Sequence, residues 1–379
     1  MLPALAVARA LAAECGDDAI ELVGARRGLE ARLLPSAGMP YVLLPGRGIA
    51  RRLTPGNLIR NLQAVAGLMW ATVLSFRIIA TRRPSVVVAV GGYASVPPSF
   101  AAVVCRVPLV VLNVDAVAGA ANRFLGRFAR ASAIAYAGTS LPRAIITGAP
   151  VRPEVASVRR GSPVRSAARL ALGLPEDRLV IAAFGGSLGA RRINFAVADL
   201  AKRWTDRSDV LIYHVVGRRN VDSEESHQVL SALESAVEGI RLVQVPYEDR
   251  MELLYQAADI AVCRSGAMTV AELAVVGLPA VLVPLPGAPG DHQSANARVL
   301  ERAGGALVLP DAQCTSEQLD RLLAPLLSNT ARLAAMGRAA AAVGRADAAG
   351  SIAALAIKHA KVSRSKSAER VADVVEGVR

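Results

Sequence analysis

One stretch of the chain, Cys263–Asn296, combines a turn, a helix and polar side chains that together could bind a phosphate. After a short apolar run, Arg264-Ser265-Gly266 turns the chain, and Met268–Val276 is predicted to form a helix. The unpaired amides at the start of a helix, and the dipole of the helix, both favour a negative charge. The order of strand, turn and helix therefore predicts an anion site.

Two side chains of this helix suggest a more specific ligand. Glu272 follows Thr269 by three residues and so lies on the same face. Its carboxylate could accept both hydroxyls of a ribose, while Ser265, Ala267, Met268 and Thr269 offer amides or a hydroxyl to phosphates. The same spacing is also that of a capping box, which only closes the start of a helix. The residues alone leave both interpretations open.

A second glycine-rich turn, Gly185-Gly186-Ser187-Leu188-Gly189, directly follows an apolar run. These glycines would let a diphosphate or a sugar approach the backbone closely. A dinucleotide fold would place an acidic residue at the end of the next strand. Here that strand ends in Gly217-Arg218-Arg219, which argues against a nicotinamide cofactor. The alternative is a tight strand–helix turn without a ligand.

The elements that must position these turns alternate between strands and helices, which predicts a doubly wound α/β fold. Helices are expected over residues 2–15, over Leu58–Ala80 and through most of Thr315–Ala360. Strands are expected at Ala19–Gly24, Ser85–Val90, Leu109–Asn113, Ser132–Ala137 (closing the first domain), Leu179–Phe184, Val210–Val216, Ile240–Val245, Asp259–Val262, Ala280–Pro284 and Ala306–Leu309.

The length of 379 residues predicts two domains of about 150–200 residues each. With 53% hydrophobic but only 4% aromatic residues, the core must be aliphatic, which suits parallel strands buried on both faces. We expect a first domain over residues 1–150, a linker region over 151–177, a second domain over 178–345, and a C-terminal helix and charged tail over 346–379.

The net charge of +13 comes almost entirely from arginine. Nucleic acid, an anionic membrane surface, a pyrophosphate substrate and plain compositional bias could each explain it. No basic run is interleaved with aromatic residues, so we expect no nucleic-acid partner. The four cysteines form no CxxC pair and are expected to be buried thiols rather than a disulfide or zinc framework.

Several separated motifs, in one order, resemble the MurG family of glycosyltransferases, which complete lipid II in peptidoglycan synthesis. The resemblance is carried by RSGAMTVAELAVVGLPAVLVPLP and DHQSANA, by Gly91–Ser95, by Pro150-Val151-Arg152 and by Gly185–Arg191. It extends from Leu2 to about Ala360. Any one of these motifs would be a weak signal, whereas their combination is specific.

The resemblance implies the GT-B fold, in which two doubly wound Rossmann-like domains face a cleft. It implies an inverting transfer of N-acetylglucosamine from UDP-N-acetylglucosamine, a substrate, to undecaprenyl-pyrophosphoryl-MurNAc-pentapeptide. Helix starts and arginine would carry the pyrophosphate charge, so no cofactor and no metal are expected. The enzyme would act as a peripheral protein at the anionic cytoplasmic face of the cell membrane.

The resemblance also implies roles for individual residues. Glu272 would hold the ribose, and Ala267, Met268 and Thr269 the phosphates, with Gly186 and Ser187 beside the diphosphate. Arg152 would reach the nucleotide or sugar, and Gln293 and Asn296 the sugar hydroxyls, while His292 would be structural. The acceptor side would comprise Gly91, Gly92, Tyr93, Ser95 and Asn122.

The chain departs from the family pattern where a catalytic base is expected. Leu112-Asn113-Val114-Asp115 replaces His-Glu-Gln-Asn, and no histidine precedes His214. Family members carry a turn ending Gly-Gly-His-Val before the first helix, and we expect such a segment upstream of Met1. Within the chain, Asp115 is the nearest substitute base. Two alternatives stay open: a UDP-sugar transferase for another lipid, and a non-catalytic nucleotide-sugar-binding relative.

The helix predicted at Leu58–Ala80 has two interpretations. Its uncharged apolar stretch, Ala64–Phe76, is shorter than the about 20 residues that a membrane span needs. Spacing favours a helix packed in the core, whereas the family resemblance favours a helix on the membrane surface.

Overall fold

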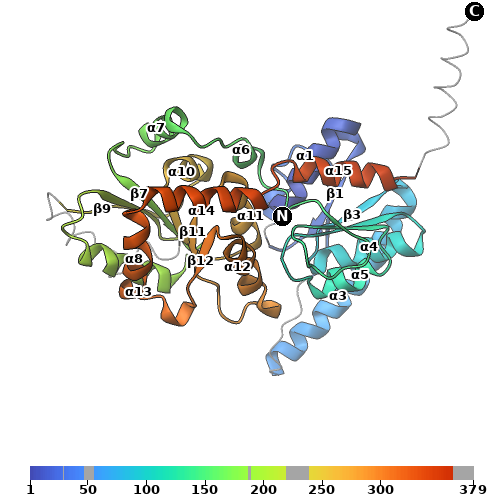
Figure 1. Cartoon of the computed structure of the whole chain (residues 1–379). Coiled ribbons are helices and arrows are strands. Elements are labelled where there is room, and N and C mark those ends of the chain that lie inside the picture. Colours follow the sequence, from blue (N-terminus) through green and yellow to red (C-terminus); the bar gives the residue numbers. More distant parts are fainter. Residues whose placement is uncertain (29, 47–54, 187–188, 219–238, 362–379) are drawn as a thin grey trace, which may run out of the picture. The chain divides into compact units, whose positions relative to one another are not determined.

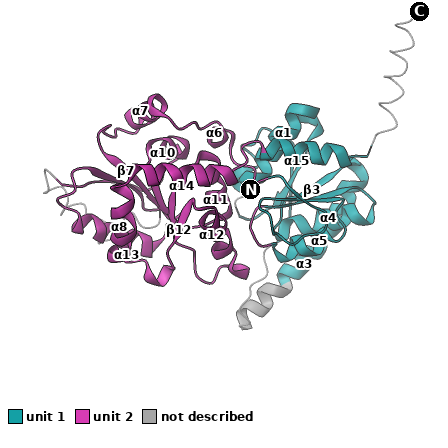
Figure 2. Cartoon of the chain, in the orientation of Figure 1, with its two compact units in different colours: residues 1–113, 118–147, 348–379 teal, residues 114–117, 148–347 magenta. Residues whose placement is uncertain are grey.

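A computed structural model of the chain describes residues 1–28, 30–46, 55–186, 189–218 and 239–361, with only the backbone described for residues 55–62. The chain divides into two compact units (Figure 2). Unit 1 comprises residues 1–113, 118–147 and 348–379, and unit 2 comprises residues 114–117 and 148–347. Each unit is an α/β layer structure with parallel strands only among its described pairs.

Unit 1 contains two separate parallel sheets (Figure 1). The first joins β1 (Leu22–Ala25) to β2 (Tyr41–Leu44), and the second has the order β3 (Val87–Ala89), β4 (Leu109–Asn113), β5 (Ala131–Ile134) and β6 (Ala144–Ile146). Its helices are α1 (Leu2–Cys15), α2 (Glu30–Leu33), α3 (Pro55–Arg82), α4 (Val96–Val104), α5 (Ala120–Gly126) and α15 (Ala348–His359).

Two features of unit 1 differ from the sequence prediction. The strand predicted to close the first domain, β5, is not the last strand of the unit, because β6 follows it and pairs with it. Strand β6 has only three residues, Ala-Ile-Ile, too few for a periodic pattern to reveal it in the sequence. Helix α15 packs against α1, so the last helix belongs to the same unit as the first.

Unit 2 is built on one sheet with the order β12-β11-β10-β7-β8-β9. The strands are β7 (Leu179–Phe184), β8 (Val210–Val215), β9 (Arg241–Val245), β10 (Ile260–Cys263), β11 (Ala280–Leu282) and β12 (Ala306–Val308). This is the doubly wound order of a Rossmann fold, with the switch point between β7 and β10. Its core is aliphatic, as the composition predicts, and includes Ile181, Ile193, Ile212 and Leu319.

The helices of unit 2 are α6 (Pro153–Ala156), α7 (Ser162–Ala171), α8 (Arg191–Arg203), α10 (Met251–Ala257), α11 (Ala267–Val276), α12 (His292–Ala303), α13 (Ser316–Leu327) and α14 (Thr330–Val343). Residues 151–177, expected to contain a linker, therefore form two helices, and α7 packs against α10. Of the cysteines, Cys263 and Cys314 are buried as expected, whereas Cys15 and Cys105 are exposed.

Helix α3 is buried on one face only. Ala64, Ala71, Ser75 and Ile79 are buried, and Phe76 packs edge-on against Phe100 of α4, with ring centroids 6.3 Å apart. The opposite face exposes large apolar side chains, namely Val65 (46%), Met69 (67%), Trp70 (58%) and Val73 (56%). The prediction of a core helix is therefore wrong for that face. Small residues on the buried face let α4 approach closely and leave the larger ones in solvent.

By length and composition, the described residues contain two segments that could cross a membrane. One is Gln63–Arg82, which contains the uncharged stretch Ala64–Phe76 and extends past Arg77. The other, Thr330–His359, consists of α14 and α15 with a break at residues 344–347. Core helices of soluble proteins have the same length and composition, so these two segments do not by themselves indicate a membrane span.

Candidate functional site

The two predicted phosphate turns of unit 2 follow adjacent parallel strands. One follows Phe184 at the end of β7, the other follows Cys263 at the end of β10, and these two residues pair in the sheet. The carboxyl ends of parallel strands lie at one edge of the sheet, and ligands of such folds bind there at the switch point. The fold thus brings both turns to the expected place.

Helix α11 begins without a side-chain cap. Its N-cap is Gly266, and its first turn contains no acidic residue. Thr269 is therefore the third residue of the helix instead of its cap, and Glu272 lies a turn further on. The capping-box interpretation is wrong, and the helix presents its open start, at Ala267, Met268 and Thr269, to any ligand at this edge.

Glu272 is buried, with 7% of its surface exposed, in contact with two polar side chains. The hydroxyl of Tyr255 on α10 donates a hydrogen bond to Glu272 Oε2 at 2.8 Å. Arg152 Nε lies 3.6 Å from Glu272 Oε1. Burial raises the pKa of Glu272, and the charge of Arg152 and the Tyr255 hydrogen bond oppose that shift. Three distant segments thus converge on one carboxylate.

Arg152 immediately precedes α6 and is half-buried. Among the described residues its Nε finds no hydrogen-bond partner, and its contact with Glu272 is an ion pair at longer range. A guanidinium held in this way keeps donors for a further anion. Sequence reasoning missed Tyr255, although a tyrosine in the apolar helix MELLYQA signals a buried hydroxyl that needs a partner.

The glycine-rich turn after β7 is tight. A side chain at Gly185 would collide with the backbone nitrogen of Ala190, so only glycine fits there. Gly186 (φ 84°) and Gly189 (φ 75°) adopt left-handed conformations, and the Gly189 amide donates to the Gly186 carbonyl at 2.9 Å. Open space surrounds the position of a Gly186 side chain. The predicted contact of Ser187 lies outside the described residues.

Asp311, which sequence reasoning missed, connects the two turns. Its Oδ1 accepts from Arg264 Nη1 at 2.6 Å, and its Oδ2 lies 3.1 Å from Arg192 Nε. Arg264 belongs to the turn before α11, and Arg192 to the first turn of α8. Arg264 also donates to the carbonyls of Val283 and Pro284. A single carboxylate therefore fixes both turns relative to each other.

Gln293 and Asn296 on α12 bind mainly to the protein. Leu285 N donates to Gln293 Oε1 at 3.0 Å, and Ser265 Oγ donates to the Gln293 carbonyl at 2.8 Å. Asn296 is fully buried and donates through Nδ2 to the Ser265 carbonyl at 3.2 Å. His292 Nδ1 lies 2.8 Å from the Pro289 carbonyl, which fits its structural role.

Asn296 also holds the short segment 114–117. Its Nδ2 donates to Asp115 Oδ1 at 3.0 Å, and its Oδ1 accepts from the Ala116 amide at 2.7 Å. Every polar atom of the Asn296 side chain is thus used within the protein. These bonds give it a positioning role, and its contact with a sugar hydroxyl stays a prediction. Asp115, which the sequence predicts as a substitute base, is held by this residue.

The acceptor-side residues all lie in unit 1. Gly91 (φ 90°) and Gly92 (φ 79°) both adopt left-handed conformations before Tyr93, which is 37% exposed. Ser95 Oγ donates to the Gly92 carbonyl at 2.9 Å and so tightens the turn. Asn122 is buried, and its Nδ2 donates to the Leu112 carbonyl and to Asn113 Oδ1. Its Oδ1 has no hydrogen-bond partner among the described residues.

Comparisons with known proteins agree with this geometry. Residues 1–134 match the glycosyltransferase family 28 N-terminal domain, and residues 180–352 match the corresponding C-terminal domain. The computed structure resembles Acinetobacter baumannii MurG with a TM-score of 0.75 and 28% identity, covering 94% of this chain and 95% of that one. A Neisseria meningitidis UDP-GlcNAc 2-epimerase shares the fold at 12% identity (TM-score 0.63, 94% and 96% covered). Fold and site together define a glycosyltransferase of the GT-B class.

Two curated relatives identify the family more closely. A UDP-N-acetylglucosamine–N-acetylmuramyl-(pentapeptide) pyrophosphoryl-undecaprenol N-acetylglucosamine transferase from Acidothermus cellulolyticus is 41% identical over 91% of each chain. The enzyme of the same description from Mycobacterium sp. (strain JLS) is 40% identical over 95% of this chain and 92% of its own. The chain belongs to the MurG family of glycosyltransferases.

Proposed function

We propose that this chain transfers N-acetylglucosamine from UDP-N-acetylglucosamine to undecaprenyl-pyrophosphoryl-MurNAc-pentapeptide, converting lipid I to lipid II. In this reaction an acceptor hydroxyl attacks the anomeric carbon, a β-1,4 bond forms with inversion, and UDP leaves. The observation that carries the proposal is the buried Glu272, held by Tyr255 and Arg152 beside the uncapped start of α11.

Each of these groups has a task in the transfer. The Glu272 carboxylate accepts the ribose hydroxyls, and the amides at the start of α11 bind the diphosphate. As UDP leaves, negative charge grows on the β-phosphate, and preorganised amides together with Arg152 stabilise it without a metal. Asp115, placed by Asn296, is our candidate for the base that takes the hydroxyl proton.

The exposed apolar face of α3 supports a membrane-bound substrate. Val65, Met69, Trp70 and Val73 lie on it, and the exposed Arg77 and Arg83 follow toward and beyond the end of the helix. Apolar side chains that enter the lipid boundary beside cations are typical of peripheral helices on anionic membranes. We therefore place the protein at the cytoplasmic face of the cell membrane.

A turnover assay tests the proposal. Labelled UDP-N-acetylglucosamine is supplied with a lipid I analogue, with diacylglycerol, or without acceptor, and transfer of label is expected with the lipid I analogue alone. Transfer to diacylglycerol alone would favour a related lipid glycosyltransferase. UDP binding without transfer to either lipid would favour a non-catalytic relative.

Asp115→Asn tests the base. If Asp115 accepts the proton, kcat should fall by about a hundredfold or more while the KM for UDP-N-acetylglucosamine stays unchanged. Asn keeps the shape of the side chain and can still contact Asn296. An unchanged kcat would place the base elsewhere.

A further inference from the structure

Unit 2 contains a cavity of about 410 Å³ that the donor site does not use. It lies beside Val180 and Asp259, which stand at the amino ends of β7 and β10, whereas the phosphate turns follow the carboxyl ends of the same strands. The cavity is therefore at the opposite edge of the sheet. Its lining residues are Arg160, Gly161, Ser162, Arg165, Ser166, Arg169, Glu176 and Gln256.

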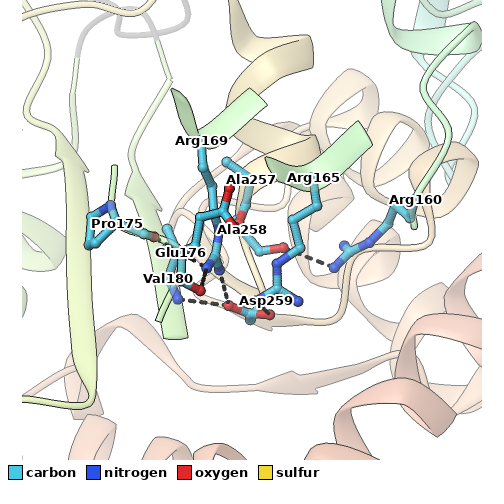
Figure 3. A network of polar contacts seen from close by, with 9 residues as sticks. All are labelled: Arg160, Arg165, Arg169, Pro175, Glu176, Val180, Ala257, Ala258 and Asp259. Atoms are coloured by element: carbon cyan, nitrogen blue, oxygen red, sulfur yellow. Dashed lines mark hydrogen bonds and ion pairs between the residues drawn. The ribbon is translucent and has the colours of Figure 1, made fainter. Parts of the chain in front are cut away.

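Asp259 anchors this cluster of side chains (Figure 3). Its Oδ1 lies 2.8 Å from Arg165 Nη2, and its Oδ2 accepts from Arg169 Nη2 at 2.9 Å and from the Val180 amide at 2.8 Å. Arg169 is buried and also donates to the carbonyls of Ala257 and Glu176. Asp259 and Arg169 thus neutralise each other's charge and form the floor of the cavity.

Arg160 and Arg165, which lie above this floor, keep N–H groups that form no hydrogen bond within the described residues. Each guanidinium carries five N–H groups. Arg165 uses one nitrogen for Asp259, and Arg160 donates from Nη2 to the Ala258 carbonyl at 2.9 Å. Three arginines face only two carboxylates, Glu176 and Asp259, so the cluster is net positive. The start of α7 adds to this field, because Gly161 caps it without a side chain and its first turn contains no acidic residue.

We propose that this cavity binds a small anion that carries a phosphate group. Arg160 and Arg165 supply charge-assisted hydrogen bonds, and the hydroxyls of Ser162 and Ser166 with the amide of Gln256 complete the set of donors. The volume lies within the range of roughly 300–1,000 Å³ that is typical of small-molecule sites, and it exceeds the space needed for a bare phosphate. Pyrophosphate or an organic phosphate fits better.

Calorimetric titration of the full chain with pyrophosphate tests this site, with UDP present at saturation so that the donor site is blocked. Binding of one pyrophosphate per chain is expected. The double change Arg160→Gln and Arg165→Gln should weaken it by about a hundredfold, roughly tenfold for each lost charge-assisted pair. Arg159→Gln is the matched control, because this neighbour contacts the carbonyls of Ala156 and Val158 and does not line the cavity.

Thermal unfolding verifies that both variants are folded, as expected because Arg169 still pairs with Asp259. A second arm uses vesicles that contain phosphatidic acid, to distinguish a lipid headgroup from a soluble anion. Pyrophosphate binding that the double variant loses and Arg159→Gln retains supports the proposal. No pyrophosphate binding in the presence of UDP, or equal loss in all variants, overturns it. Binding to vesicles without binding of pyrophosphate would show that the site takes a lipid headgroup, and would overturn the proposal of a soluble ligand.

Discussion

The predicted donor turns of unit 2 and the predicted acceptor turn of unit 1 are built differently. In unit 2, Glu272, Asn296 and Asp311 each have two or more protein partners before any substrate arrives. In unit 1, Asn122 keeps a buried oxygen that has no donor among the described residues. An unsatisfied buried acceptor costs about 1–3 kcal/mol, which a ligand that donates a hydrogen bond can recover. We propose that the donor turns are preorganised and that the acceptor turn gains a hydrogen bond from its substrate.

The apolar surfaces show the same contrast. The core of unit 2 has strands buried on both faces under helices such as α8 and α13. Unit 1 instead leaves one face of α3 in solvent. The proposed binding of a membrane by the exposed face of α3 would account for this difference. Four predictions test this comparison, from the largest expected effect to the smallest.

Of the four changes, removal of Asp311 should lower the stability of unit 2 the most. Asp311→Ala leaves Arg264, whose side chain is only 13% exposed, without its carboxylate. Breaking such a pair costs about 3 kcal/mol of stability or more, and both phosphate turns should loosen. Chemical denaturation and UDP titration should show both effects. Asp320→Ala, which removes only the hydrogen bond from Trp204, should cost about 1 kcal/mol and leave UDP affinity unchanged. Unchanged UDP affinity in Asp311→Ala would contradict preorganisation by this residue.

Acid should destabilise unit 2 through His214, the one buried histidine among those that the structure describes. Burial lowers its pKa from 6.5 to about 4. The unfolded chain takes up this proton near pH 6.5 and the folded one near pH 4, so stability is full above that window and falls as the pH decreases through it. The loss amounts to about 3 kcal/mol. His214→Gln should remove this part of the pH dependence in denaturation curves. If wild type and His214→Gln lose the same stability between pH 7 and pH 4, the pKa of His214 is not lowered by burial.

Glu272→Gln should weaken UDP binding by about 1.5–3 kcal/mol, because a carboxylate that accepts ribose hydroxyls is replaced by a neutral amide. Stability should not fall at neutral pH. Since burial raises the pKa of Glu272, its charged form disfavours folding above that pKa, and glutamine removes the penalty. Glu248→Gln is a matched control, because Glu248 also pairs with a tyrosine and an arginine, Tyr213 and Arg250. Equal UDP affinity in wild type and Glu272→Gln would refute the ribose contact.

The exposed face of α3 should matter least to stability and most to membrane binding. Met69, Trp70 and Val73 changed together to serine should alter the free energy of unfolding by only about 0.5 kcal/mol, because all three are already in solvent. Binding to anionic vesicles, which should weaken as salt rises, is expected to be lost. Leu170→Ser, at an 82% exposed site of unit 2, should leave vesicle binding unchanged. If the triple variant unfolds or still binds vesicles, this face is not the membrane surface.

Local patterns in the sequence predicted much of the fold and the general place of the site. The helix over residues 2–15 and the strand Leu109–Asn113 appear with the predicted bounds, because a continuous apolar or helical run can be recognised without knowing its partners. The turn and helix after Cys263 follow from Gly266 at the start and from Gly277, in the left-handed conformation (φ 70°), at the end. The glycines after β7 likewise predicted a tight turn at that position.

Only the tertiary structure decided which side chains meet. Asp311 bridges two turns and Asp259 bonds to Val180, because the strand order of unit 2 makes β7 and β10 neighbours. Glu272 meets Tyr255 and Arg152 because the packed helices bring three separate segments together. Asn296 likewise bonds to Asp115 and Ala116, which lie about 180 residues away in the chain, and no local pattern indicated this contact. A local pattern encodes the period and the ends of an element but not its neighbours. Pairings between segments far apart in the chain depend on sheet order and burial, which the whole fold sets.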